Sequence, residues 1–110
     1  GIAEGAHADG NQTRAGSNNT FRYNNFDLPI TVPAPYKINA CFMLQQADGP
    51  ITNFVAEYNW FNGGGWVIYS SGDVKLNYNK FGRDYRYGLL TGTPTQCIGN
   101  VWEDTGLPCF

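Results

Sequence analysis

The chain has 110 residues, a formal net charge of −2 and few charged residues (15%). This length corresponds to a single domain. The lysines and arginines are scattered and form no basic stripe, so the composition argues against a nucleic-acid partner. No apolar stretch approaches the roughly 20 residues that a membrane-spanning helix requires, so we expect no membrane insertion.

The first 20 residues differ in composition from the rest of the chain. The segment GIAEGAHADGNQTRAGSNNT contains a single large apolar residue, Ile2, and is typical of a polar, flexible lead or stalk. It also contains two N-glycosylation patterns, Asn11-Gln12-Thr13 and Asn18-Asn19-Thr20, which arise easily in an Asn-rich stretch. We therefore predict a lead at residues 1–20 and a β domain at residues 21–110.

Alternating apolar and polar residues predict a series of short strands after residue 20. The expected strands are 30–35, 38–46, 51–61, 66–70, 73–79, 84–90 and 96–102. In the expected strand 51–61, alternation places four residues on one face: Phe54, Ala56, Tyr58 and Trp60. In the expected strand 73–79, it places Val74, Leu76 and Tyr78 inside and Asn79 outside. Short turns between strands favour antiparallel pairing, because parallel strands need long crossovers. The predicted fold class is all-β, a small antiparallel sandwich or barrel of about 6–8 short strands.

The stretch NWFNGGGWVIY (59–69) contains three consecutive glycines between aromatic residues. A phosphate-binding loop would precede a helix and carry Lys with Ser or Thr, whereas Trp66 and a β-branched run follow here. We predict a hairpin connection in which Asn62 and the glycines take positive φ values.

Catalytic and metal-binding patterns are missing from the sequence. There is no Cys-x-x-Cys pair and no nucleophile elbow, and the single histidine is His7, so we expect no metal site and no cofactor. Glu57 is the best single carboxylate for glycoside hydrolysis, but an ion pair with Lys75 or an arginine across the strands is the simpler interpretation. The sequence favours a non-enzymatic protein.

Three cysteines allow two interpretations. Cys97 and Cys109 could close a disulfide loop near the C-terminus, or all three thiols could be free in a reducing compartment. Cys41 lies in an apolar strand and is expected to pack as a small hydrophobic residue.

Adjacent aromatic residues suggest a binding surface. One member of the pair Trp60-Phe61 must point away from the core unless both faces of the sheet are covered. Such a ring would lie either in a subunit interface or in a platform for sugars, with nearby amides supplying hydrogen bonds. The stretch GRDYRYG (82–88) allows two interpretations. Its arginines could form local ion pairs and stack on aromatic rings, which is the simpler interpretation, or they could contact an anion or a sugar acid. The candidate ligand-binding residues are Trp60, Phe61, Asn62, Gly64, Trp66, Tyr85 and Arg86.

Three stretches resemble a known kind of protein: AGSNNTFRYNNFDLPITVP, FNGGGWVIYSSGDVKLNY and CIGNVWEDTGLPCF. Together they resemble the receptor-binding C-terminal tip domain of a bacteriophage tail fibre or tailspike. This resemblance implies an adhesin on the virion, assembled as a homotrimer, that attaches to a host cell-surface glycan or outer-membrane protein. The alternatives are a secreted, disulfide-bonded toxin or inhibitor and a structural module for trimerisation or capping.

Overall fold

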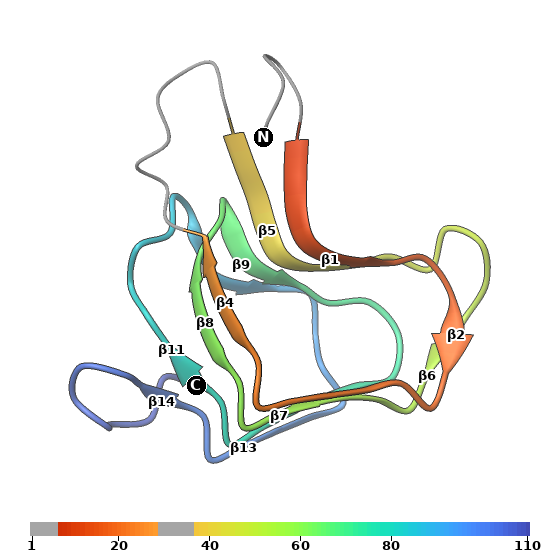
Figure 1. Cartoon of the computed structure of the whole chain (residues 1–110). Helices are drawn as coiled ribbons and strands as arrows, with labels where there is room; N and C mark the ends of the chain where they lie inside the picture. Colours follow the sequence, from red (N-terminus) through yellow and green to blue (C-terminus); the bar gives the residue numbers. More distant parts are fainter. Residues whose placement is uncertain (1–6, 29–36) are drawn as a thin grey trace.

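The computed structural model describes residues 7–28 and 37–110, and all regular secondary structure in these residues is β-strand (Figure 1). Sheet A contains β1 (His7–Thr13), β5 (Lys37–Leu44), β9 (Trp66–Tyr69) and β12 (Gly88–Thr91). Sheet B contains β2 (Gly16–Ser17) and β6 (Ile51–Thr52). Sheet C contains β3 (Thr20–Arg22), β7 (Phe54–Glu57), β10 (Val74–Asn77) and β13 (Gln96–Ile98). Sheet D contains β4 (Asn25–Leu28), β8 (Trp60–Gly63), β11 (Lys80–Phe81) and β14 (Val101–Trp102).

Within each sheet the strands follow one another in chain order, and every strand pair is parallel. The chain therefore visits the sheets in turn and returns to each one a coil later, as the nested turns in Figure 1 show. This arrangement is a parallel β-helix, a solenoid whose coils contact only their neighbours. Successive coils are offset by 35, 20 and 21 residues at the corner between sheets C and D.

The prediction of an antiparallel sandwich or barrel is wrong. It assumed that strands joined by short turns pair with each other, whereas here consecutive strands belong to different sheets. The long crossover that parallel pairing requires is the remainder of each coil. The glycine stretch is consequently not a hairpin: Gly63 ends β8 in sheet D, and Gly64 and Gly65 form the corner that leads to β9 in sheet A.

Gly64 shows why this corner requires glycine. Its φ is +85°, and a Cβ atom there would lie 2.9 Å from Ala40 Cα in the coil below. The predicted positive φ is confirmed for Gly63 and Gly64 and is wrong for Asn62 and Gly65. The absence of a side chain at Gly64 lets neighbouring coils approach closely.

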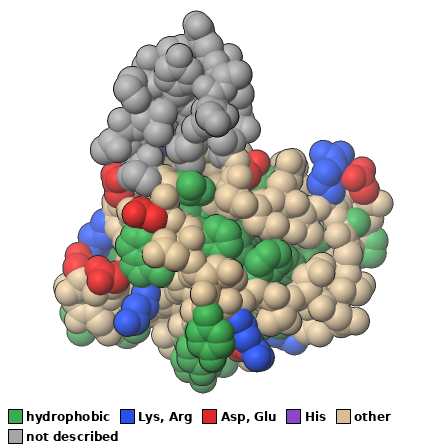
Figure 2. All heavy atoms as spheres, viewed as in Figure 1, with side chains coloured by type: hydrophobic (Ala, Val, Ile, Leu, Met, Phe, Trp, Pro, Cys, Tyr) green, Lys and Arg blue, Asp and Glu red, His purple; other side chains and the backbone are tan. Residues whose placement is uncertain are grey.

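The core fills the space enclosed by the coils. Phe61 stacks between Phe26 and Phe81, with ring centroids 5.3 Å apart on both sides, and meets the edge of Phe42 at 4.9 Å. Alternation within β7 and β10 is as predicted up to the corner, since Phe54, Ala56, Val74 and Leu76 are all buried. Figure 2 shows hydrophobic groups at the centre of this face and at its lower edge, with charged groups scattered around the rim.

Past the corner, alternation fails. Tyr58 and Tyr78 are exposed, and Asn59 and Asn79 are buried, which is the reverse of the predicted facing for Tyr58, Tyr78 and Asn79. Trp60 is likewise on the outside, and its neighbour Phe61 is buried instead. Both tyrosines have left-handed backbone conformations, with φ values of 55° and 56°. A single left-handed residue turns the chain at the corner. As a result, the residues that face inward after the corner are shifted by one position from those that simple alternation predicts.

The boundary predicted at residue 20 falls within the first coil. Strand β1 pairs with β5, and β2 pairs with β6, so residues 7–13 and 16–17 belong to the solenoid. Residues 1–6 and the whole of the predicted strand 30–35 lie outside the described residues, and so does the side chain of His7.

Candidate binding groove

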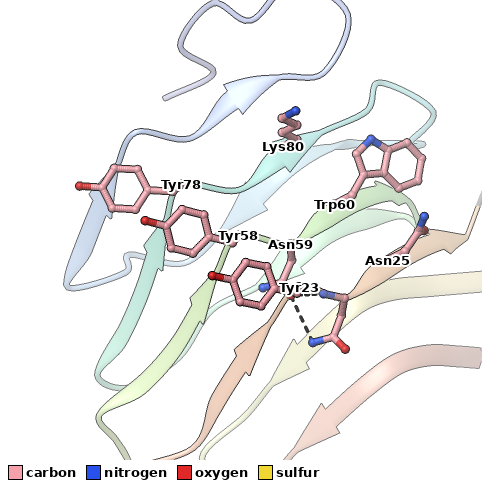
Figure 3. Close-up of a pocket in the computed structure, with 8 residues that line it drawn as sticks. Tyr23, Asn25, Tyr58, Asn59, Trp60, Tyr78 and Lys80 are labelled. Atoms are coloured by element: carbon pink, nitrogen blue, oxygen red, sulfur yellow. Dashed lines mark hydrogen bonds between the residues drawn. The ribbon is translucent and has the colours of Figure 1, made fainter.

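A groove of about 450 Å³ runs along the outside of the corner between sheets C and D (Figure 3). Its lining comes from the first three coils: Tyr23, Asn24, Asn25, Tyr58, Asn59, Trp60, Tyr78 and Lys80. A volume of this size is within the usual range for small-molecule sites.

Three tyrosines form one wall of the groove, which we call the tyrosine ladder (Tyr23, Tyr58 and Tyr78). The ring centroids are 5.6 Å and 5.4 Å apart, with interplanar angles of 17° and 16°. The exposed fractions are 77%, 48% and 47% in chain order, and the hydroxyls all point to the same side in Figure 3. At the equivalent place in the fourth coil stands Gly99, and a Cβ atom there would lie 2.5 Å from the Tyr78 ring.

The other wall consists of outward-facing residues of sheet D. Asn25 pairs in register with Trp60, and Trp60 pairs with Lys80. Each of the first three coils therefore contributes one ladder tyrosine and, two residues later, one residue of this second wall. Because neighbouring strands lie about 4.8 Å apart, the groove repeats its walls at that spacing along the solenoid axis.

Beneath the groove lies an asparagine ladder formed by Asn24, Asn59, Asn79 and Asn100. In each step, one side-chain oxygen accepts hydrogen bonds from the backbone N–H and the side-chain amide of the preceding asparagine; the Asn79 oxygen lies 2.9 Å and 3.2 Å from those two nitrogens of Asn59. The same pattern joins Asn59 to Asn24 and Asn100 to Asn79. The side-chain amides of Asn59, Asn79 and Asn100 also donate to backbone carbonyls of the coil below. These bonds satisfy amides that would be costly to bury unpaired, and they fix the corner on which the tyrosines stand.

Lys80 gives the groove a positive charge. None of the eight lining residues is acidic. Among the described residues, ion pairs join Arg14 to Asp48, Arg22 to Glu57 and Arg83 to Asp104, and Lys80 takes part in none of them. Its ammonium group is exposed and available to an anion.

The structure places the predicted ligand-binding residues in different parts of the molecule. Trp60 lines the groove, whereas its neighbour Phe61 is 0% exposed and belongs to the core. Trp66 is half-buried on sheet A, where its ring lies 6.4 Å from that of Tyr87.

A third group of predicted residues meets at the corner between sheets D and A. The side-chain oxygen of Asn62 accepts a hydrogen bond from the backbone N–H of Asp84. The carbonyl oxygen of Gly64 accepts a hydrogen bond from the backbone N–H of Arg86. Asn62 also donates to Asp27, and Tyr85 packs against the core. These contacts are structural, and the only predicted residue that lines the groove is Trp60.

The tyrosine ladder, Asn25 and Lys80 were missed, although a sequence signal marks them. The segments TFRYNNF (20–26), VAEYNWF (55–61), KLNYNKF (75–81) and QCIGNVW (96–102) align in the observed register. The first three share Tyr-Asn followed by Phe two positions later. Repeated units of this kind predict stacked coils, but the unequal spacing hides the repeat from a search at one fixed period.

Two simpler interpretations made from the sequence are confirmed. Glu57 accepts a hydrogen bond from Arg22 on the neighbouring strand, as expected for a cross-strand ion pair. The stacking predicted for an arginine of 82–88 is also confirmed, since the guanidinium of Arg83 lies 3.9 Å from the centroid of Trp102. The ion pair of Arg83 is with Asp104, however, and not with a residue of the same stretch. In the described part of the chain, no group of His, Cys, Asp and Glu is placed to hold a metal ion. Residues 7–28 and 37–110 include no helix that could span a membrane.

The three cysteines are free thiols in the structure. Cys41 is fully buried, as predicted, and burial raises the pKa of its thiol to about 12. Partial burial raises the pKa of Cys109 to about 11 and also raises that of Cys97, which is exposed.

We expect a thiol reagent to label these cysteines in the order of their exposure, because only an accessible thiolate reacts. At mildly alkaline pH, Cys97 should react first and Cys109 more slowly, and Cys41 should react only after unfolding. Mass spectrometry of peptides from native and denatured protein, with and without prior reduction, measures this order. Labelling of Cys97 and Cys109 only after reduction would show a disulfide and contradict the free-thiol state.

Comparison of the chain with protein-family models, with curated proteins and with solved structures returned no match. The fold and the groove therefore define the class of this protein on their own. Its described residues form a parallel β-helix with an aromatic groove along one outer corner, and none of the described residues that line this groove is acidic.

Proposed function

We propose that this protein is a non-enzymatic glycan-binding domain whose binding site is the groove between the tyrosine ladder and Trp60. The observation that carries the proposal is the row of exposed rings at strained backbone positions. Sugar rings pack on aromatic surfaces, and the amide of Asn25 can hydrogen-bond to hydroxyls.

The backbone strain is informative because it is repeated. Left-handed conformations cost a bulky residue on the order of 1–3 kcal/mol, and such strain tends to gather at ligand sites. The fourth coil has Gly99 at this position, with φ of 65°, so the corner accommodates glycine. Three coils nevertheless carry tyrosine, and stacking of about 0.5–1.5 kcal/mol per pair offsets part of the cost.

The surroundings of the groove favour binding without chemistry. Hydrolysis of a glycoside normally requires two facing carboxyl groups, and the eight described residues that line the groove supply none. The carboxylate of Glu57, the best candidate from sequence, is held by Arg22. Attachment to a host cell-surface glycan as a homotrimer on a virion, which the tail-fibre resemblance implies, stays a prediction.

Binding to an array of immobilised oligosaccharides tests the proposal. We expect the unmodified protein to bind at least one glycan class, and Trp60→Ala to weaken that binding about tenfold, the loss of about 1.4 kcal/mol expected for a stacking aromatic anchor. Tyr58→Gly should also weaken binding while changing the free energy of unfolding by no more than about 1 kcal/mol, because lost stacking and relieved strain nearly cancel.

The matched control is Trp66→Ala, which removes the same kind of ring from sheet A, outside the groove. It should leave glycan binding unchanged. An array without any bound glycan, or equal losses in Trp60→Ala and Trp66→Ala, would contradict the proposal.

A further inference from the structure

The charge pattern of the groove narrows the class of ligand. Lys80 is exposed on the second wall in the third coil, and none of the described residues that line the groove is acidic. The nearest arginine in sequence to the tyrosine ladder, Arg22, is already paired with Glu57. The groove therefore presents one unneutralised cation beside aromatic and amide groups, in a protein whose net charge is −2.

The groove also extends along the solenoid axis. Its two walls repeat from coil to coil, with Asn25, Trp60 and Lys80 in register on neighbouring strands. A ligand in contact with all three coils extends along the solenoid axis over about 10 Å, two strand spacings. An extended oligosaccharide matches this shape better than a compact ligand does.

From these two observations we infer that the ligand is an acidic, linear oligosaccharide that lies along the solenoid axis with its anionic group at Lys80. The inference rests on the proposed function. Trp60 and the tyrosine ladder contact the sugar rings, Asn25 meets hydroxyls in the first coil, and the ammonium group of Lys80 selects an anionic sugar over its neutral counterpart.

The test uses an array that contains each oligosaccharide backbone as a matched pair, for example a uronate and its methyl ester or a sialylated glycan and its desialylated form. We expect the bound members to be the acidic ones. Lys80→Gln should weaken their binding roughly two- to fivefold, the effect of a partly exposed ion pair, and added salt should reduce binding by the unmodified protein.

Lys75→Gln is the control, since it removes the same charge from sheet C, where Lys75 donates to Asn53 outside the groove. It should retain full binding. Binding of both members of a pair with equal strength, or binding of acidic members unaffected by Lys80→Gln, would overturn the inference and leave the proposed function standing. An array without bound glycans would overturn both.

Discussion

Asn79→Ala should lower the free energy of unfolding by about 3 kcal/mol or more. Asn79 is 0% exposed, and its side chain joins three coils. Its removal leaves the backbone N–H and side-chain amide of Asn59, and the carbonyl of Ala56, without these partners. Each buried polar group that loses its partner costs about 1–3 kcal/mol. Urea unfolding measures the loss, which corresponds to a fall of about 12 °C or more in Tm.

Asn25→Ala is the matched control for this variant. Asn25 is an exposed asparagine of the same corner in the first coil, and its side chain makes no hydrogen bond to another described residue. Its substitution should change the free energy of unfolding by less than about 0.5 kcal/mol. A similarly small change for Asn79→Ala would show that the asparagine ladder does not hold the coils together.

Phe61→Ala and Trp60→Ala should give opposite results, although the two residues are adjacent. Phe61 stacks on Phe26 and Phe81 inside the coil, so its truncation should cost about 3–5 kcal/mol in the free energy of unfolding. Trp60 faces the groove, and its truncation should cost no more than about 1 kcal/mol. Chemical denaturation monitored by circular dichroism measures both.

The pair also distinguishes a core residue from a ligand contact. Phe61 was predicted to bind ligand, but the structure places it in the core, so any binding defect of Phe61→Ala should follow the unfolded fraction. At low temperature, where the variant remains folded, glycan binding should return. A stable Phe61→Ala variant would contradict the placement of this ring.

Local chemistry predicted several features of the protein. The sequence correctly indicated β-structure, and alternation identified the buried faces of β7 and β10. It also predicted the burial of Cys41 and the ion pairing of Glu57. Each of these features depends on a short segment and on the preference of apolar side chains for the interior. The pattern of neighbouring residues is therefore enough to predict it.

The pairing of strands could not be obtained in this way. A turn of two to five residues looks the same in sequence whether it reverses the chain into a hairpin or bends it into the next sheet. The corner at Tyr58 and Tyr78 shows the difficulty, because tyrosine rarely adopts a left-handed conformation and nothing local indicates that it does so here.

By itself, then, the sequence determined the all-β character of residues 7–28 and 37–110 and the buried faces of β7 and β10. It also contains the Tyr-Asn repeat from which the groove is built. Only the tertiary structure decided that the strands are parallel and that Tyr23, Tyr58 and Tyr78 lie side by side with Lys80 near them. The physical reason is that coils of unequal length stack through hydrogen bonds between residues 20 to 35 positions apart, which local alternation does not reveal.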